Sequence, residues 1–361
     1  MQERLRRLLF TGAATTTLLG LTVVNPTASL AASRGQAAKT YTIYLSNNFL
    51  GNDWRVLMEN LARVLSAKPP LAGRVDLKIE NTAENTASAQ IQQLQEIIAQ
   101  RPSAIVLDSA SPTALNPVVQ SACKAGIVVV SFDQVITAPC AWKAHVNSYQ
   151  EGVYDAEWIA RTLHGKGDIY DDIGIAGTPI AQEFDSAYSK VFKHYPRIKV
   201  VCQMATNAAL GTEESAVSNC LSAHPTVNGI ISLGFGTGAM KVLKQAGHVP
   251  VPIAAASYNA TMLACASKSQ PCFVVSDPPW LGGYAVKLAV SVLDHKLSGK
   301  PQDIYVSTPY YENNGVAIPG LKTTNIVVGQ NAYRSLPGGT FLPISPPWTT
   351  VTPREALSGK V

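Results

Sequence analysis

The sequence predicts an α/β protein with two lobes, each built on a parallel, doubly wound sheet. Short apolar strand candidates alternate with amphipathic helix candidates, at about 25–30 residues per strand–helix unit, which is the pattern of a parallel sheet. The alternation restarts near residue 147, where a second lobe is expected to begin. The chain has 361 residues, which is long enough for two domains of ordinary size.

The stretch 41–65 is the clearest strand–turn–helix unit. Tyr41–Leu45 is short, apolar and rich in β-branched and aromatic residues, as expected of a buried strand. Asn52 or Asp53 can cap the helix that follows. Apolar residues on that helix recur at the spacing of one buried stripe, namely Trp54, Leu57, Met58, Leu61 and Leu65. Ligands bind at the carboxyl ends of strands in open α/β sheets, so the turn 46–51 is expected to face a ligand.

The rest of the chain gives the other elements. Further strands are expected at 75–79, 104–107, 127–132, 168–175, 198–204, 229–233, 253–256, 273–275 and 304–307. Helices are expected around 91–98 and at 112–125, 149–163, 181–194, 212–223, 239–246 and 282–297. The lobes are predicted at 40–146 plus 278–305 and at 147–277. Residues 306–361 should hold a hinge strand and an irregular Pro/Gly-rich tail with one strand candidate, Thr324–Val328.

Residues 1–32 have the composition of an export signal. Arg4, Arg6 and Arg7 precede an apolar stretch that ends at Val24 and is followed by small-x-small cleavage candidates. A membrane anchor is the alternative, but threonines and glycines interrupt the apolar stretch, which favours cleavage near residues 31–33. The mature protein is expected in the periplasm.

The six cysteines fit an oxidising compartment. They lie in the sequence as three close pairs, and an exported chain with an even number of cysteines is expected to form disulfides. Six cysteines allow fifteen pairings. We expect the local ones: Cys123–Cys140, Cys202–Cys220 and Cys265–Cys272. A metal site would need a C-x-x-C or Cys/His cluster, and the sequence has neither, so no metal is expected.

Composition argues against several function classes. The formal charge of +5 is mild, and no dense Lys/Arg run follows the first ten residues, so nucleic acid and anionic membranes are not expected partners. The chain lacks the G-x-S-x-G, H-E-x-x-H and P-loop motifs.

The turn Gly234–Gly238 follows a strand and opens a helix, but its G-x-G-x-G spacing is not that of a dinucleotide site. A tight turn near a ligand is the competing interpretation, and no cofactor is predicted.

Polar side chains recur at predicted strand ends in both halves. They are Asn47, Asn48, Asn81, Asp108, Ser109, Asp133, Asn207, Asn259 and Asp277, and aromatic residues accompany them at Phe49, Trp54, Tyr258 and Trp280. Amides and carboxylates hydrogen-bond hydroxyl groups, and aromatic faces cover the C–H faces of sugar rings. Asn and Asp also favour turns for local reasons, so each residue alone has a structural alternative. Three carboxylates, Asp108, Asp133 and Asp277, can also converge as in a glycosidase.

Several motifs in order resemble a known family. They are LSNNFLGNDW, IVLDSASPTALNPVV, AGIVVVSFD, HPTVNGIISLGFGTGAMKVLKQAG and SYNA before SDPPW. Together they resemble the type I periplasmic sugar-binding proteins of ABC importers, the ribose/galactose-binding group, over about residues 41–307. The resemblance implies two Rossmann-like lobes joined by a three-strand hinge. It also implies a ligand bound between the lobes, lobe closure, and docking of the closed form on a membrane permease.

The resemblance also implies site residues. First-lobe contacts would fall on Asn47, Asn48, Phe49 and Trp54, with Asp133 as the key carboxylate. Second-lobe contacts would fall on Gln182, Asn207, Ser232 or Gly234, and Asn259, and Asp277 would lie at the third crossing. The predicted site also includes Asp108, Gln134, Asn147 and Trp280. Trp54 lies on the apolar stripe as well, so a core role is equally expected.

Three positions depart from the family pattern. Gln134 and Gln182 stand where arginines are common, and Asn259 stands where an aspartate is common. Charged hydrogen bonds are stronger than neutral ones, so the pocket should prefer a neutral ligand other than ribose.

The sequence therefore predicts a non-enzymatic, monomeric solute-binding protein for a small neutral sugar or polyol, which it delivers to an ABC permease. Two alternatives remain: a sugar sensor of the same fold that feeds a receptor kinase, and a secreted carbohydrate-active enzyme.

Overall fold

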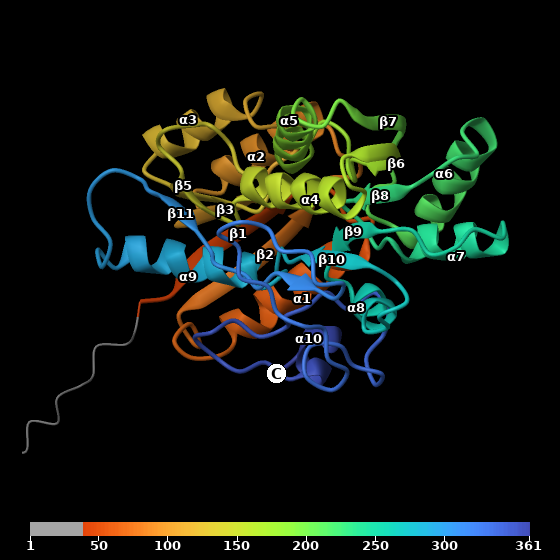
Figure 1. The fold of residues 1–361 in the computed structure, drawn as a ribbon. Coiled ribbons are helices and arrows are strands. Elements are labelled where there is room, and N and C mark those ends of the chain that lie inside the picture. The colour runs from red at the N-terminus through yellow and green to blue at the C-terminus, as the bar shows by residue number, and fades with distance from the viewer. Residues whose placement is uncertain (1–38) are drawn as a thin grey trace, which may run out of the picture. The chain divides into compact units, whose positions relative to one another are not determined.

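The computed structural model describes residues 39–361, so the predicted export signal at 1–32 lies outside the described residues. Within 39–361 the chain forms two six-stranded sheets with helices on both faces (Figure 1). The predicted two-lobed α/β fold is confirmed.

The first lobe is built on a fully parallel sheet of order β11-β5-β4-β3-β1-β2. Its strands are β1 (Tyr41–Asn47), β2 (Val75–Asn81), β3 (Ala104–Asp108), β4 (Val128–Phe132), β5 (Trp142–His145) and β11 (Asp303–Tyr305). Its helices are α1 (Asp53–Ser66), α2 (Ala87–Ala99), α3 (Asn116–Lys124) and α9 (Leu281–Leu293). Side chains alternate across β1: Ile43 and Leu45 pack in the cluster with α1 and α9, and Tyr44 packs with α2 and α3.

The second lobe repeats this plan with the order β12-β10-β9-β8-β6-β7, parallel except for the edge strand β12. Its strands are β6 (Lys166–Asp172), β7 (Arg197–Met204), β8 (Gly229–Ser232), β9 (Ile253–Ala256), β10 (Cys272–Val275) and β12 (Tyr311–Glu312). Its helices are α4 (Ser148–Thr162), α5 (Pro179–Phe192), α6 (Leu210–Ala223), α7 (Thr237–Gln245) and α8 (Asn259–Cys265). Ile169 packs with α4 and α5, whereas its neighbour Tyr170 packs with α6 and α7.

The chain passes between the two sheets three times. The crossings lie between β5 and α4, between β10 and α9, and between β11 and β12. Asp277 follows β10 and therefore lies at the second crossing, not at the third as expected from the resemblance. Two short elements, β5 and α8, were not predicted as regular structure, because four and seven residues carry little periodicity.

The C-terminal segment, residues 316–361, is irregular as predicted but contacts both lobes. The strand expected at Thr324–Val328 is wrong: Thr324 and Val328 form only isolated bridges, and two valines of this run are 38% and 40% exposed. Only Ile326 of the run is buried, and among residues 39–361 the run pairs through isolated bridges alone, so its β-branched residues do not form a sheet. The segment ends in α10 (Pro353–Ser358), which contacts α1 (Figure 1).

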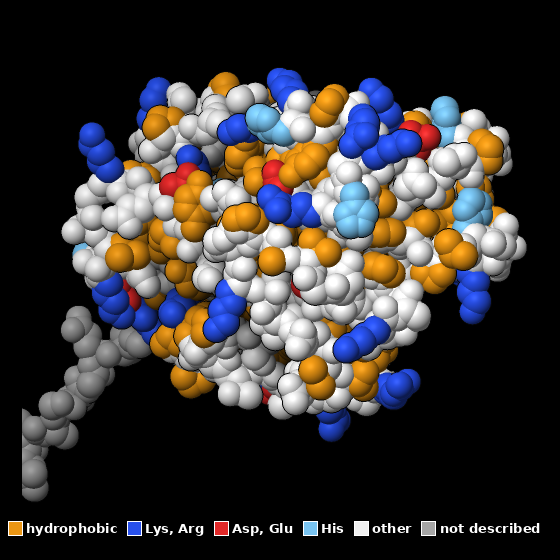
Figure 2. All heavy atoms as spheres, in the orientation of Figure 1, with side chains coloured by type: hydrophobic (Ala, Val, Ile, Leu, Met, Phe, Trp, Pro, Cys, Tyr) orange, Lys and Arg blue, Asp and Glu red, His pale blue; other side chains and the backbone are white. Residues whose placement is uncertain are grey.

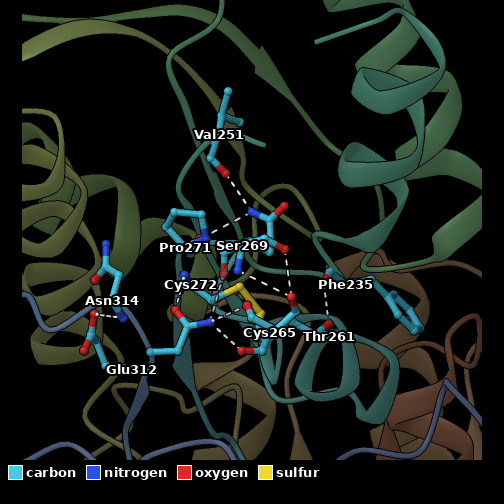
Figure 3. Close-up of a disulfide and its surroundings, with 12 residues drawn as sticks. Phe235, Val251, Thr261, Cys265, Ser269, Pro271, Cys272, Glu312 and Asn314 are labelled. Carbon is cyan, nitrogen blue, oxygen red and sulfur yellow. Dashed lines mark hydrogen bonds between the residues drawn. A yellow bond between two sulfur atoms is a disulfide. The ribbon is translucent and has the colours of Figure 1, made fainter. Parts of the chain in front are cut away.

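Three disulfides join the local cysteine pairs expected from the sequence: Cys123–Cys140, Cys202–Cys220 and Cys265–Cys272. The third closes the loop between α8 and β10 (Figure 3). Asn313, directly after β12, holds this loop, because its Oδ1 accepts from the Cys272 N–H at 2.9 Å and its amide donates to the Gln270 carbonyl at 2.9 Å. The loop before β10 is therefore held in two ways, by the disulfide and by the side chain of Asn313.

On the face that Figure 2 shows, Lys and Arg side chains are spread over several separate places. Among residues 39–361, no helix is long and apolar enough to cross a membrane. The same residues contain no group of three or more His, Cys, Asp or Glu side chains able to hold a metal ion.

Candidate functional site

A cavity of about 90 Å³ lies between the lobes. Its polar lining comes from both lobes and from the second crossing: Asn52, Arg55, Asp133, Gln134, Ser148, Glu151, Thr178 and Asp277. Its apolar lining includes Trp54, Ile173, Ile175, Phe184, Leu233, Tyr258, Val275 and Phe341. The cavity therefore offers hydrogen-bonding groups and aromatic surface together.

Arg55, in the first turn of α1, is the buried cation of the site. Its guanidinium forms an ion pair with Asp108, lies 3.7 Å from the Asp133 carboxylate and donates to Asn47 Oδ1 at 3.0 Å. It also lies over the Trp54 ring, 5.1 Å from the centroid. These partners compensate a charge that is only 2% exposed, so Arg55 organises the strand ends of the first lobe.

Several polar atoms that line the cavity have no hydrogen-bond partner among residues 39–361. They are Asp133 Oδ1, Asp277 Oδ1 and the Ser148 hydroxyl. Buried polar groups are almost always paired, because an unmade hydrogen bond costs about 1–3 kcal/mol. These atoms are therefore available to a ligand or to water.

Two carboxyl groups of the cavity have raised pKa values. Burial raises the pKa of Asp277 well above its usual range, and the neighbouring Asp133 carboxyl raises it further, while Arg55 opposes the shift. Burial and the nearby Asp155 raise the pKa of Glu151 in the same way. A protonated carboxyl can both donate and accept, so the raised pKa values of Asp277 and Glu151 favour the form that offers both kinds of hydrogen-bonding group beside the Arg55 cation.

Trp54 serves the cavity and the core at once. Its ring lines the cavity and packs in the main hydrophobic cluster of the first lobe. Its indole N–H donates to the Asp277 carbonyl at 2.6 Å, which joins the start of α1 to the second crossing. The core role expected from the sequence is therefore present, and the position of the ring leaves its predicted ligand contact a prediction.

Two hydrogen bonds cross between the lobes at the cavity. The Asn52 amide donates to the Asn207 carbonyl at 3.0 Å, and the Ile180 N–H donates to Gln134 Oε1 at 3.0 Å. Asn52 also caps α1 by accepting from the Arg55 N–H. The structure is therefore a closed form, in which both lobes contact each other around the cavity.

Only part of the predicted site lines the cavity. Trp54, Asp133, Gln134 and Asp277 do so. Asn47 and Asp108 lie behind it and hold Arg55. The buried Asn48 donates to Asn85 at 2.6 Å, outside the lining.

The other predicted residues lie elsewhere in the structure. Asn147 is exposed and caps α4, Gln182 is exposed and donates to the Gly177 carbonyl, and Asn207 reaches the site only through its backbone. Asn259 is buried but bonds to the C-terminal segment. Phe49, Gly234 and Trp280 are not among the cavity-lining residues.

Sequence reasoning missed Arg55, Ser148, Glu151 and Phe184. Arg55 stands beside the apolar stripe of α1, where a charge is normally solvent-exposed, and only the carboxylates of β3 and β4 explain its burial. Glu151 and Phe184 lie on helices α4 and α5, about one turn inside their starts, whereas the polar pattern that predicts the site recurs at strand ends. Sequence signals for these positions are weak because helix faces become cavity walls only in the assembled fold.

The glycine-rich turn 234–238 is hydrogen-bonded to the side chain of Glu213. Glu213 Oε2 accepts from the Gly238 N–H at 3.0 Å, at the start of α7. A Cβ atom at Gly238 would lie 2.6 Å from the same oxygen. The helix N-terminus, which could otherwise attract an anion, is thus occupied by a carboxylate. The motif is a tight turn between β8 and α7, and its residues are not among those that line the cavity.

A family model described as "Periplasmic binding protein domain" matches residues 43–297. The chain belongs to this family. The match runs from within β1 to just past the end of α9 and includes the first two crossings. It leaves out β11, the third crossing, β12 and the C-terminal segment.

Curated relatives of the chain are named as binding proteins. A xylitol-binding protein of Mycolicibacterium smegmatis is 27% identical over 186 residues, which cover 50% of this chain and 53% of that protein. A D-apiose import binding protein of Actinobacillus succinogenes is 25% identical over 172 residues, covering 46% of this chain and 56% of that protein. The chain thus spans about half the length of these two relatives. The ribose import binding protein of Bacillus subtilis is 22% identical over 75% of this chain and 86% of its own length.

Solved structures share the fold. An ABC transporter solute-binding protein from Thermobispora bispora matches with a TM-score of 0.66 and 26% identity, over 80% of this chain and 84% of that chain. A solute-binding protein from Burkholderia graminis in complex with D-arabinose matches with a TM-score of 0.68 and 21% identity, over 80% of this chain and 100% of that chain.

Proposed function

We propose that this protein is an exported, monomeric solute-binding protein. It captures a small neutral sugar or polyol between its lobes and delivers it to an ABC permease. The observation that carries the proposal is the set of unpaired buried oxygens, on Asp133, Asp277 and Ser148, in an aromatic-lined cavity between two lobes. Sugar hydroxyls donate and accept, as these groups do, and sugar C–H faces suit aromatic rings. The names of the curated relatives, which bind xylitol, D-apiose and ribose, support the ligand class.

Calorimetric titration of the mature protein with pentoses, hexoses and pentitols tests the binding step. We expect one ligand or a few stereochemically related ligands to bind with one site per chain. Silence across the whole panel would overturn the proposal. Uptake of the radiolabelled ligand, compared between cells with and without this protein, tests delivery separately.

Asp133→Asn should weaken binding of the identified ligand by about tenfold or more, because hydrogen bonds to a charged group contribute about 1.5–3 kcal/mol. Asp185→Asn, on an exposed part of α5, is the matched control and should bind as the wild type does. Calorimetry measures both, with thermal unfolding as the check on folding. Equal affinities for the two variants would exclude Asp133 as a ligand contact.

One feature favours a second function. The cavity is lined by the carboxyl groups of Asp133, Glu151 and Asp277, and the pKa values of Glu151 and Asp277 are raised. Glycosidases use pairs of carboxyl groups with such shifts as acid and base. Release of nitrophenol from nitrophenyl glycosides, abolished by Asp133→Asn, would support an enzyme. We expect no turnover, with the ligand recovered unchanged after dissociation.

A further inference from the structure

The C-terminal segment supplies one wall of the cavity, through Phe341. This residue lies beyond residue 297, where the match to the family model ends. We propose that Phe341 is a ligand-contacting residue that determines specificity by covering an apolar C–H face of the bound molecule. The inference rests on the proposed function and names a residue of that same site.

Backbone hydrogen bonds fix the position of Phe341 on both sides. The Leu342 N–H donates to the Ser257 carbonyl at 3.0 Å, and the Asn259 N–H donates to the Thr340 carbonyl at 2.8 Å, which makes an antiparallel bridge centred on Tyr258 and Phe341. The hydroxyls of Ser257 and Ser276 both donate to the Leu342 carbonyl at 2.6 Å. The segment is thus held against the end of β9 and the second crossing.

Asn259 anchors the same segment from the second lobe. Its amide donates to the carbonyls of Tyr333 and Leu336 at 2.8 and 3.0 Å, and its Oδ1 accepts from the Tyr333 N–H at 2.8 Å. The resemblance placed Asn259 among the ligand contacts. In this chain its hydrogen-bonding groups hold the segment that carries Phe341.

Neighbouring rings hold the Phe341 side chain. Its ring meets Tyr258 edge to face, with centroids 4.8 Å apart, and Tyr258 stacks on Phe235 at 3.8 Å. Successive side chains of an extended segment point to opposite sides. Phe341 therefore lines the cavity, while Leu342 lines a separate hollow within the C-terminal segment.

A fixed ring in a cavity that also holds polar groups discriminates between stereoisomers. The same cavity holds Arg55, Asp133 and Asp277, which suit hydroxyl groups. A hydroxyl directed at the Phe341 ring would lose its hydrogen bonds to water without gaining a new hydrogen-bond partner. A C–H group at the same place has no such hydrogen bonds to lose. The ring should therefore reject epimers whose hydroxyl points toward it.

The test titrates the full-length mature protein and three variants with the ligand panel by calorimetry, and records thermal unfolding of each without ligand. Phe341→Ala should weaken binding by about tenfold or more, a typical effect of lost apolar pocket contacts. Phe341→Leu should weaken binding by less than Phe341→Ala does. It should also reduce the ratio between the affinity for the best ligand and the affinities for its epimers. Leu342→Ala removes a neighbouring apolar side chain, so it should lower the unfolding temperature while leaving affinity within about threefold.

The outcomes separate the two claims. Wild-type protein that binds nothing in the panel overturns both the proposed function and this inference. Wild-type protein that binds, with Phe341→Ala equal to it in affinity and ligand order, overturns the inference alone. Equal weakening by Phe341→Ala and Leu342→Ala also overturns it, because the effect would then come from docking of the segment and not from the ring.

Discussion

At the scale of single residues, Arg55 is the charge on which the first-lobe side of the cavity depends. Its guanidinium is buried beside the carboxylates of Asp108 and Asp133, and the opposite charges compensate each other's loss of hydration. Isolated buried charges are costly, whereas paired and hydrogen-bonded ones are tolerated. The strand ends of β3 and β4 and the start of α1 are therefore tied together electrostatically before any ligand binds.

Replacing Arg55 by methionine should destabilise the protein strongly. The variant leaves Asp108 and Asp133 buried without a cation, which costs about 3–5 kcal/mol for a broken buried pair. Urea unfolding at neutral pH measures the change. Arg63→Met, on the same helix but 46% exposed in its pair with Glu59, should cost less than about 1 kcal/mol. Similar losses in the two variants would contradict the role given to Arg55.

At the scale of elements, buried side chains connect successive strand–helix units. Glu213 of α6 binds the N-terminal turn of α7, and Asp172 at the end of β6 accepts from Thr206 and from Ser232 at the end of β8. Asn313 similarly holds the disulfide loop before β10. Glu213 and Asp172 sit at the carboxyl-end side of the second sheet, where strand ends must be organised before the cavity can form. Asn313 lies at the opposite side, beside the start of β10.

The buried Glu213 should make stability depend on pH. Burial raises its pKa from the usual 4.5 to about 8, and Asp172 adds to this shift. Between these two pH values the folded protein binds more protons than the unfolded chain, so its stability falls as pH rises. Glu213→Gln keeps an oxygen that accepts from the Gly238 N–H but has no carboxyl group to titrate. The stability of this variant should therefore decrease less as pH rises.

Urea midpoints at pH 5 and pH 8 measure the effect in wild type and variant. Glu214→Gln, whose side chain lies on the same helix and pairs with the exposed Lys241, serves as the control and should keep the wild-type slope. An unchanged slope in Glu213→Gln would show that other groups cause the pH dependence.

The three disulfides should be found in the exported protein as local pairs. Peptide mapping under non-reducing conditions should recover Cys123 with Cys140, Cys202 with Cys220, and Cys265 with Cys272. The first two close loops of 17 and 18 residues, for which chain entropy gives about 3 kcal/mol each. Free thiols in material purified from the periplasm would contradict both the pairing and the oxidising compartment.

At the scale of the whole molecule, the closed form is held by contacts that cross between the lobes. Asn52 and Gln134 of the first lobe bond to backbone groups of the second, and Trp54 bonds to the second crossing. The C-terminal segment adds contacts with both: Lys68, which follows α1, pairs with Glu355, and the backbone beside Phe341 bonds to Ser257. Because Asn52, Gln134, Trp54 and Phe341 line the cavity, ligand binding and lobe closure should be coupled.

Asn52→Asp should shift this balance toward an open form. Aspartate caps a helix as well as asparagine does, so α1 should remain intact. Its carboxylate cannot donate to the Asn207 carbonyl, and the two oxygens would repel each other. We expect a larger radius of gyration without ligand in X-ray scattering, and weaker ligand binding. Thr86→Asp, at the N-cap of α2 within the first lobe, should change neither; equal behaviour of both variants would contradict the coupling.

The sequence by itself determined the alternation of strands and helices and the two lobes, and it favoured the local cysteine pairs without excluding the other pairings. Apolar periodicity and short-range spacing encode these features, so they can be read without knowing what packs against what. It also identified Trp54, Asp133, Gln134 and Asp277, because parallel strand ends and the segments beside them meet at one edge of a sheet.

Only the tertiary structure decided which polar residues face the cavity. Asn259 and Asn47 have the residue types of ligand contacts, but one holds the C-terminal segment and the other holds Arg55. Arg55 and Phe341 carry no local signal, since a charge beside an apolar stripe and a phenylalanine in an irregular tail acquire their roles from distant partners. Burial and hydrogen bonding depend on contacts between residues far apart in the chain, and those contacts exist only after the lobes and the segment have assembled.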